Sequence, residues 1–492
     1  MCGYCQQDRD GKNAPTQAGE QCNMGESVNY ISTRNTNEIL GFNETLLRGL
    51  APDGGLYVPS EWPKIRPDDL ASLKLGYANL AAQILKPFIG QDIDDPTLQN
   101  ITSEAYSEFC CEEVAPLVEI GPSLWLLELF HGPPLSFKDF ALQVVSRMFD
   151  HVLSQKGEHI TVIGATSGDT GSAAIEACKN RQNIDLFMLH PLGRVSEVQR
   201  RQMTSVDAAN IHNIAVKGTF DDCQSLVKEM FGDPHFNKEL SLAAVNSINW
   251  ARVMVQVVYY YAAFMKLRNK LLTFSVPTGN FGNVYAGYVA KRTGLPSKEL
   301  LVATNQNDIL HRVLTTGTYQ TESVIPGISP SMDIQVASNF ERYLFELQGR
   351  DHHALCQNME ALKDDGKFTI TSNHMECARK FFSSSSIDEA ETLGEMELVY
   401  SETGNLIDPH TAVGTAAARK STYREIGPMV CLATAHPAKF SESVMKATGK
   451  RPSIPDRLLS ALESKERYDI LECEILKIQS YIRQRSRRSH KI

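Results

Sequence analysis

One lysine stands in an unusual setting for a charged side chain, within the segment HGPPLSFKDF. Lys138 follows Phe137 and lies two residues before Phe140, at the predicted start of a helix whose apolar residues recur every four positions. Lysine is ordinarily a solvated surface charge. Here the helix N-terminus disfavours the ammonium form and the aromatic side chains exclude water, and both effects lower the pKa of the amine. A neutral lysine amine is a nucleophile that can form a Schiff base.

A loop with the composition of a phosphate cradle lies further along the chain. PTGNFGN, Pro277 to Asn283, joins an apolar strand to a helix. Gly279 and Gly282 allow backbone N–H groups to approach a bound anion, and the helix N-terminus adds the positive end of its dipole. The loop matches neither the Walker pattern nor the dinucleotide pattern, which favours a phosphate on some other ligand than ATP or NAD. A plain strand-to-helix turn remains the alternative.

A second loop, ATSGDTG at 165–171, follows another apolar strand in the same way. The hydroxyls of Ser167 and Thr170 and the amides around Gly168 could hold a carboxylate. Asp169 is a polar side chain within the same loop. By itself this pattern is weak, but it repeats the plan of the first loop.

The segment NSINWAR brings two amides, a hydroxyl and an arginine together within residues 246–252. Arg252 can pair with a phosphate through two parallel hydrogen bonds. The helix that follows is nearly all apolar, so an arginine at its start should have a partner. The alternative is that Asn246 or Ser247 caps the helix and that Arg252 is a surface residue.

The segment TAHPAKF offers a hydroxyl, Thr434, after an apolar strand, and a second lysine, Lys439. A Schiff-base lysine combined with a phosphate cradle indicates pyridoxal 5′-phosphate as cofactor. A hydroxyl suits a pyridine nitrogen that is not held protonated, so Thr434 is the candidate ring-nitrogen partner. Lys439 remains a rival for the Schiff-base role, for which we favour Lys138.

The elements that must position these residues follow a repeated pattern from about residue 111 onward. The stretches 159–180, 271–294 and 430–449 each contain an apolar strand, a polar loop and a helix. Strands that are apolar on both faces are typical of a parallel sheet covered by helices, and such alternation predicts an open α/β fold. In these folds the ligand site lies at the carboxyl ends of the strands.

The chain of 492 residues is long enough for several domains. We expect a disordered polar tail at 1–27 and a small N-terminal domain at 28–110. The catalytic core is predicted over 111–452. A helical segment with a basic tail is predicted over 453–492.

Composition and charge exclude several classes of protein. A net charge of −9 argues against a nucleic-acid partner. The most apolar stretch, 253–267, is too short to span ~30 Å of hydrocarbon, and the N-terminus has no secretory h-region. The cysteine count is odd, and Cys2, Cys5 and Cys22 have no fourth ligand nearby for zinc, so no metal is expected. We expect a cytoplasmic protein that binds no membrane.

Taken together, these segments resemble the motif set of the threonine synthase family. GPPLSFKDFALQ, ATSGDTGSAA, NSINWAR, SVPTGNFGN and ATAHPAKF occur in the family's order, and YISTRN with LAPDGGLYVP is similar to the family's N-terminal domain. The resemblance covers about residue 28 to about residue 470. It implies an α/β fold-type-II pyridoxal-phosphate enzyme with parallel sheets in two subdomains and a small N-terminal domain. The implied reaction converts O-phospho-L-homoserine and water to L-threonine and phosphate.

The resemblance also implies roles for individual residues. Lys138 would be the Schiff-base lysine, Thr434 would meet the ring nitrogen and Asp169 would lie near the ring 3′-oxygen. The cofactor phosphate would be held by Gly279, Asn280, Phe281, Gly282 and Asn283. The substrate would be held through its phosphate by Asn246, Ser247 and Arg252, and through its carboxylate by Ser167 and Thr170.

One residue departs from the family pattern, because Pro134 stands where the family usually has threonine. Any contact made through that hydroxyl is in doubt here. Asp169 is typical of the branch shared by fungi and many bacteria, for which we expect no activation by S-adenosylmethionine. The alternatives are a phospho-lyase that releases 2-oxobutyrate, ammonia and phosphate, a serine/threonine dehydratase, and a non-catalytic cofactor carrier. We expect a monomer or homodimer.

Overall fold

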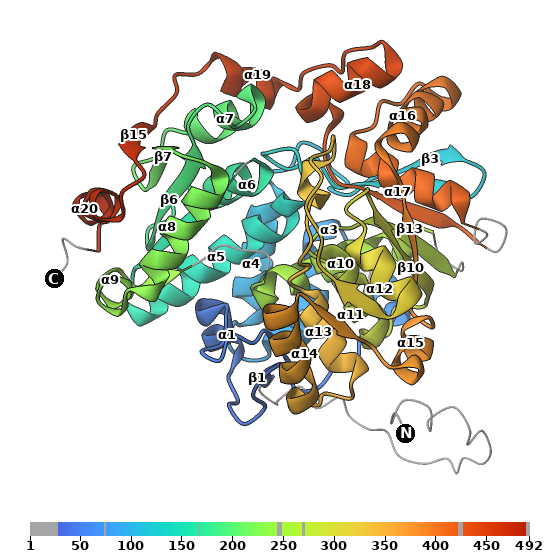
Figure 1. Cartoon of the computed structure of the whole chain (residues 1–492), viewed down its shortest axis with the longest axis horizontal. Helices are drawn as coiled ribbons and strands as arrows, with labels where there is room; N and C mark the ends of the chain where they lie inside the picture. The colour runs from blue at the N-terminus through green and yellow to red at the C-terminus, as the bar shows by residue number, and fades with distance from the viewer. Residues whose placement is uncertain are drawn as a thin grey trace.

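The computed structural model describes residues 28–72, 75–166, 168–243, 248–267, 271–421 and 427–488. The expected tail at 1–27 lies outside these residues. Within them the chain has the expected α/β fold, with two mainly parallel sheets and a small N-terminal domain. Figure 1 shows the sheets in two halves of the molecule with helices packed around them.

The larger sheet has six strands within the described residues, in the order β13-β10-β9-β14-β4-β3. Neighbouring strands are parallel except for β3 and β4, which are antiparallel. Every residue of β9 and β14 is buried, because helices cover both faces of the sheet. The bounds are β3 (Leu117–Gly121), β4 (Leu124–Glu128), β9 (Leu272–Pro277), β10 (Ser297–Thr304), β13 (Phe382–Ser386) and β14 (Met429–Ala433).

The smaller sheet has five strands in the described part of the chain, all parallel, in the order β15-β7-β6-β5-β8. Its edge strand β15 comes from the C-terminal segment, which the sequence analysis did not predict to contain a strand. The bounds are β5 (Ile160–Ala165), β6 (Ile184–Pro191), β7 (Ile211–Lys217), β8 (Leu242–Ala243) and β15 (Asp469–Glu472).

Four helices carry candidate site residues: α5 (Lys138–Lys156), α6 (Asp169–Cys178), α10 (Trp250–Lys266) and α11 (Gly282–Thr293). A fifth, α17 (Pro409–Lys420), precedes the strand that leads to Thr434. The apolar stretch 253–267 lies mostly in α10, which is buried from Trp250 to Ala263. No helix in the described ranges is both long and apolar enough to cross a membrane.

The remaining helices pack around this frame. In the first half of the chain they are α1 (Phe42–Arg48), α2 (Pro67–Ser72), α3 (Tyr77–Ile89), α4 (Asp95–Tyr106), α7 (Glu197–Thr204), α8 (Phe220–Gly232) and α9 (Pro234–Leu240). In the second half they are α12 (Ile309–Thr316), α13 (Phe340–Leu347), α14 (His352–Asp365), α15 (Ser372–Ala378), α16 (Glu389–Thr403), α18 (Ser441–Thr448), α19 (Asp456–Glu463) and α20 (Ile475–Arg485).

The N-terminal domain packs directly on the catalytic core. Its short antiparallel strands β1 (Tyr30–Ser32) and β2 (Tyr57–Pro59) pair with each other, as do β11 (Thr318–Gln320) and β12 (Lys367–Thr369) elsewhere in the chain. The ring of Trp250, at the start of α10, lies 6.0 Å from the rings of Tyr30, Trp62 and Phe88. The domain therefore shares one hydrophobic core with α10.

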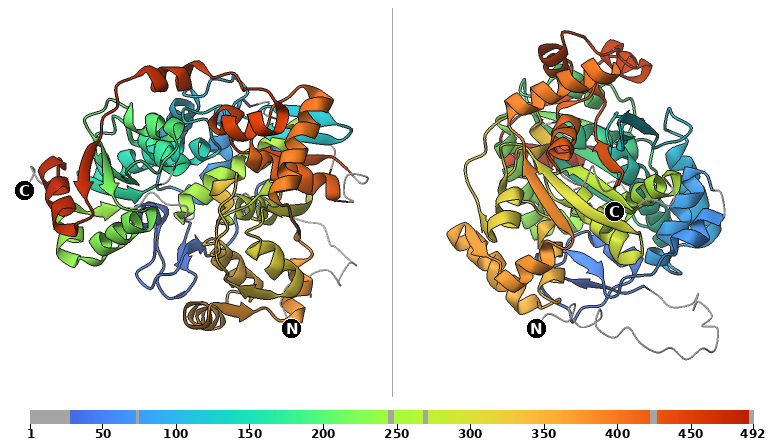
Figure 2. Two further views of the ribbon diagram at one scale, coloured as in Figure 1. Left: turned by 45° about the horizontal axis from the view of Figure 1, so that its top comes forward. Right: turned by 90° about the vertical axis from the view of Figure 1, so that its right-hand side faces the viewer.

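The C-terminal segment connects the two sheets. From α18, beside the larger sheet, the chain runs across the molecule through α19 and then pairs β15 with β7 of the smaller sheet (Figures 1 and 2). Ile478 and Ile482 of α20 are buried in the hydrophobic cluster of that sheet. This segment is thus part of the folded core and not only a surface tail.

Candidate active site

A cavity of about 690 Å³ opens between the two sheets, where β5, β9 and β14 end. It is lined by every predicted site residue that the structure describes: Lys138, Asp169, Thr170, Arg252, Gly279, Asn280, Phe281, Gly282, Asn283 and Thr434. The other three, Ser167, Asn246 and Ser247, lie outside the described residues. Residues far apart in the chain thus meet at the carboxyl ends of parallel strands, as open α/β folds require.

Lys138 is the first residue of α5, as the sequence predicts. The turn before it is held to the strand end that carries Thr434, because the backbone N–H of Phe137 donates to the carbonyl oxygen of Thr434 at 2.9 Å. Leu135, in the same turn, has a positive φ of 61°. Such a conformation is costly for a branched side chain and is often found at functional sites.

The amine of Lys138 is buried, with 9% of the residue exposed. Its Nζ lies 5.2 Å from the centre of the Phe137 ring and 3.8 Å from Oδ2 of Asp169. Burial lowers the pKa of Lys138, and the nearby cations Lys439 and Arg252 act in the same direction, while Asp169 opposes them. The direction agrees with the sequence prediction, and it favours the neutral, nucleophilic amine.

The rival lysine, Lys439, is placed differently. Its side chain is fully buried, and its Nζ lies 2.8 Å from Oδ1 of Asp169 and donates to the carbonyl of Pro134 at 2.6 Å. It is not among the residues that line the cavity. Of the two lysines, only Lys138 offers its amine to a ligand there.

Asp169 is the first residue of α6 and faces both lysines. Burial alone would raise the pKa of its carboxyl, but Lys439 and Lys138 outweigh that effect and hold it below its usual range. The side chain of Gln199, from α7, donates to Oδ1 of Asp169 at 3.0 Å. Gln199 was not predicted as a site residue, because nothing in its local sequence distinguishes it from an ordinary polar residue of a helix.

The loop from Pro277 to Asn283 connects β9 to α11 and lines the cavity. The amide nitrogen Nδ2 of Asn283 is buried and has no hydrogen-bond partner among the described residues, whereas its Oδ1 accepts from Tyr259 at 2.5 Å and from Tyr260 at 3.2 Å. The first N–H groups of a helix also lack intrahelical partners. These donors together fit an anion at the start of α11.

The glycines of this loop are needed for a different reason from the one the sequence suggested. A Cβ on Gly279 would lie 2.4 Å from the carbonyl oxygen of Ser331, and one on Gly282 would lie 3.2 Å from Nδ2 of Asn339. The backbone of Ser331 therefore excludes a side chain at Gly279, and Asn339 leaves little room for one at Gly282. Phe281 completes the turn with a positive φ of 61°.

Arg252 lies in the first turn of α10 and is buried, with Nε and Nη1 unpaired among the described residues. Burial lowers the pKa of its guanidinium to about 10. One turn later, Oε1 of Gln256 is likewise buried and without a partner in the described part of the chain, and Gln256 lines the same cavity. Gln256 was not predicted as a site residue. The signal for it in the sequence is that a polar residue stands four positions after Arg252 in an otherwise apolar helix.

Thr434 directly follows β14 and is buried. Its backbone N–H donates to the hydroxyl of Thr411 at 3.3 Å. His410, which lines the cavity but was not predicted, lies with Nδ1 2.8 Å from Oδ1 of Asp408, and its Nε2 accepts from the backbone N–H of Ser331 at 3.3 Å. The Nδ1 of His410 is thus engaged within its own helix start, and its Nε2 holds the segment that contains Ser331.

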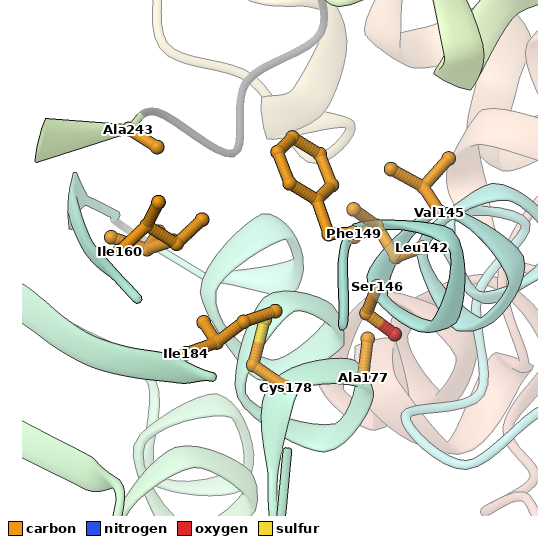
Figure 3. Close-up of a pocket in the computed structure, with 10 residues that line it drawn as sticks. Leu142, Val145, Ser146, Phe149, Ile160, Ala177, Cys178, Ile184 and Ala243 are labelled. Atoms are coloured by element: carbon orange, nitrogen blue, oxygen red, sulfur yellow. The ribbon is translucent and has the colours of Figure 1, made fainter. Parts of the chain in front are cut away.

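A second, much smaller cavity lies between α5, α6 and the smaller sheet (Figure 3). Its volume is about 10 Å³, and it is lined almost entirely by apolar side chains such as Leu142, Phe149 and Ile184. That is about the space of one water molecule, which such walls would not bind. It is a packing gap. In the described residues no cluster of three or more His, Cys, Asp or Glu side chains could hold a metal ion.

The larger cavity fits the cofactor that the sequence indicates. It contains a buried amine for a covalent link, a loop at a helix N-terminus with an unpaired amide for a phosphate, and a hydroxyl residue at a strand end for a ring nitrogen. Arg252 is a further cation that these groups leave unpaired. The arrangement can bind a phosphorylated ring and a second anion close to it.

Comparison with known proteins agrees with this arrangement. Three family models match the chain: "Threonine synthase N terminus" at residues 29–106, "Pyridoxal-phosphate dependent enzyme" at 111–435 and "Threonine synthase, C-terminal" at 411–482. The last two overlap in the segment that contains Thr434. Together they span nearly all of the described chain.

Individual proteins are similar over most of their length. A threonine synthase of Pseudomonas aeruginosa is 48% identical over 465 residues, which are 94% of this chain and 99% of that protein. A threonine synthase of Schizosaccharomyces pombe is 41% identical, over 86% of this chain and 89% of that protein. The crystal structure of PLP-bound threonine synthase from Brucella melitensis matches with a TM-score of 0.92 and 48% identity, covering 94% of this chain and all of that one.

Proposed function

The chain belongs to the threonine synthase family of pyridoxal-phosphate-dependent enzymes, and we propose that the cavity between its two sheets is the site of that reaction. The enzyme converts O-phospho-L-homoserine and water to L-threonine and phosphate. Membership of the family does not show which residues of this chain bind the cofactor, bind the substrate or transfer protons.

We propose that Lys138 holds the cofactor covalently and that the loop from Gly279 to Asn283 binds its phosphate. Thr434 would meet the ring nitrogen, and Asp169 would lie near the ring 3′-oxygen. Support comes from the cavity, which these residues line together, and from the unpaired Nδ2 of Asn283. When bound, pyridoxal phosphate supplies an electron sink that allows protons to leave carbon atoms next to the substrate amine.

The amine of Lys138 would then act as the base. It is buried next to the cavity, and its lowered pKa leaves a larger neutral fraction near neutral pH, as a general base needs. Lys138 would take the proton from the substrate Cα. After a proton has also left Cβ and the phosphate has left Cγ, Lys138 would return a proton at Cγ. Thr170, with Ser167 from outside the described residues, would hold the substrate carboxylate and keep Cα within reach of Nζ.

Arg252 would bind the phosphate of the substrate, together with Asn246 and Ser247. The observation that carries this proposal is a buried guanidinium with two unpaired nitrogens in the described structure, facing the cavity that holds Lys138. Burying a charge without a partner is costly, so a bound anion is the expected compensation. Arg252 would also stabilise the charge that develops on the leaving phosphate.

Replacing Arg252 tests this role. We expect Arg252→Ala to lower kcat/KM for O-phosphohomoserine by about 10- to 150-fold, because a charge-assisted hydrogen bond contributes about 1.5–3 kcal/mol. Arg252→Lys should recover part of the loss, since it keeps the charge without the planar fork. Arg451→Ala, at an exposed site outside the cavity, is the matched control. Unchanged kinetics in Arg252→Ala would exclude the role.

We further propose that the enzyme works in the cytoplasm as a monomer or homodimer, without a nucleic-acid or membrane partner. The acidic net charge of −9 supports the part of this proposal that concerns nucleic acid. No helix in the described residues is long and apolar enough to cross a membrane. Size-exclusion chromatography with light scattering would give the oligomeric state.

A further inference from the structure

Three buried charged side chains lie in a row that begins in the wall of the cavity and ends behind it. Asp169 stands between the two lysines, with Oδ2 3.8 Å from Nζ of Lys138 and Oδ1 2.8 Å from Nζ of Lys439. The three residues come from different elements: Lys138 begins α5, Asp169 begins α6, and Lys439 lies in the short 3-10 helix (Pro437–Phe440) after β14. The row therefore crosses between the two halves of the molecule.

The side chain of Lys439 has no exposed surface, and its ammonium is held at two points. One is the carboxylate of Asp169, and the other is the carbonyl of Pro134, at 2.6 Å. Pro134 lies in the turn that leads into Lys138, and its carbonyl also accepts from Gln202 at 3.3 Å. An ammonium buried without an anion would be unfavourable, so the pairing with Asp169 offsets the cost of burying the charge of Lys439.

The other charged groups nearby do not replace Asp169 as the negative charge. Asp139, also on α5, is fully buried, and burial raises the pKa of its carboxyl well above the usual range, which favours its neutral form; its effect on the pKa of Lys138 is smaller than that of Asp169. Arg252 on α10 is a cation, and Gln199 on α7 is an uncharged donor to Oδ1 of Asp169. Asp169 is thus the carboxylate whose charge faces Lys138, with Lys439 behind it.

We propose that Lys439 is a positioning residue of the active site, which turns the carboxylate of Asp169 toward Lys138 and balances its charge. With Lys439 in place, the pair presents no net charge to the nitrogen of Lys138 and to the cofactor attached there. The proposal rests on the proposed attachment of the cofactor to Lys138. It assigns to Lys439 a function that requires no contact with substrate.

If Lys439 balances the charge of Asp169, removing either charge should shift the pH midpoint at which the visible absorbance of the bound cofactor changes, and the direction of each shift can be predicted. Asp169→Asn leaves the cation of Lys439 uncompensated, which should lower that midpoint by about 1 pH unit. Lys439→Met leaves the anion of Asp169 uncompensated, which should raise it by a smaller amount, because Asp169 lies between Lys439 and Lys138. The double variant Asp169→Asn/Lys439→Met contains neither charge, so its midpoint should lie between that of Asp169→Asn and that of the wild type.

The experiment is a pH titration of the absorbance spectrum of the purified holoenzyme and these three variants. Opposite shifts in the two single variants, with a double-variant midpoint between those of Asp169→Asn and the wild type, support the proposal. An unshifted midpoint in Lys439→Met, or shifts of the same sign in both single variants, would overturn it. If Lys439→Met does not fold, the comparison of Asp169→Asn with the double variant decides the matter, because equal midpoints in those two would also overturn it.

Borohydride reduction and peptide mapping of the same samples separate this proposal from the one on which it rests. If the cofactor is found on Lys138 in both the wild type and Lys439→Met, the proposed attachment site is supported. The titration then tests the role of Lys439 alone. Cofactor on Lys439 in the wild-type enzyme would overturn both assignments.

Discussion

At the scale of single residues, His436 shows how a neutral side chain can support the site. Its Nδ1 accepts from the backbone N–H of Ala438 at 3.1 Å, which caps the 3-10 helix that carries Lys439. Burial, together with the nearby His131, lowers the pKa of His436 from 6.5 to about 4. The acceptor nitrogen is therefore free of a proton at neutral pH.

This residue gives a pH dependence with a defined sign. Because the folded-state pKa of His436 lies below the unfolded one, its contribution is complete above pH 6.5 and is lost as the pH falls to about 4. We expect His436→Asn, which keeps an acceptor but does not titrate, to reduce the loss of unfolding free energy across that window by about 1–3 kcal/mol. Denaturant unfolding at a series of pH values measures it, with the exposed His353→Asn as control. Equal slopes in wild type and His436→Asn would contradict the assignment.

The sequence identified residues whose chemistry depends on their immediate neighbours. Lys138 at a helix start and the loop at 277–283 were found because the required signals lie within a few positions. The partners of Asp169 were not found. Gln199 and Lys439 contact it only because strands distant in sequence end at the same place, and short-range patterns carry no information about such contacts.

At the scale of secondary structure, α13 ties the walls of the site together through Arg342. This fully buried side chain donates to the carbonyl of Tyr57 in β2 at 2.9 Å, to the carbonyl of Ile248 before α10 at 2.5 Å, and to Oδ1 of Asn339. Asn339 in turn donates to the carbonyl of Asn280 at 3.1 Å. One guanidinium thus connects the N-terminal domain, the segment before Arg252 and the loop proposed to bind the cofactor phosphate.

Replacing Arg342 by lysine tests this connection. Lysine keeps the charge but cannot form three hydrogen bonds in one plane. We expect Arg342→Lys to weaken cofactor binding at least tenfold and to raise KM for O-phosphohomoserine, because two walls of the cavity lose a common anchor. Cofactor release, followed by equilibrium dialysis and absorbance, measures the first effect. Wild-type cofactor affinity in a folded Arg342→Lys protein would show that α13 does not position the loop. Arg379→Lys, on the surface near α15, is the control.

The long-range pairing of strands also explains what the sequence could not predict about the elements. The alternation of strands and helices in the sequence predicted that the strands of the sheets are parallel. The strand β15 was not predicted, because Asp469–Glu472 is mostly exposed and has no apolar run. It becomes a strand only by pairing with β7, which is distant in sequence. The domain limits at 110 and 452 stay predictions.

At the scale of the whole molecule, the C-terminal segment adds an edge strand to the smaller sheet and covers part of it with a helix. α20 buries Ile478 and Ile482 against that sheet, and Arg487 pairs with Asp185 of β6 at 2.6 Å. Deleting residues 465–492 would expose the edge of β7 as well as this apolar surface. We expect the melting temperature to fall by at least about 5 °C, since several buried side chains lose their contacts.

Deletion of residues 1–27 is the matched control for that experiment. The sequence predicts no periodic structure and no complete metal set there, so melting temperature and activity should stay unchanged. Differential scanning calorimetry of both truncated proteins measures the contrast. A C-terminal deletion as stable as the full chain would show that α20 and β15 add little to the core. A large loss on deleting 1–27 would refute the predicted dispensability of that segment.

The central claim concerns the product that leaves the cavity. Synthase and phospho-lyase would share Lys138, Arg252 and the loops around them, and Pro134 is the nearby departure from the family pattern. Its carbonyl is occupied by Lys439 and Gln202, so the backbone of this turn remains firmly held. The direct measurement incubates the cofactor-saturated enzyme with O-phospho-L-homoserine at neutral pH and quantifies threonine, 2-oxobutyrate and phosphate in one sample. Threonine and phosphate in equal amounts, with little 2-oxobutyrate, is the expected result, whereas 2-oxobutyrate in excess of threonine would contradict the account.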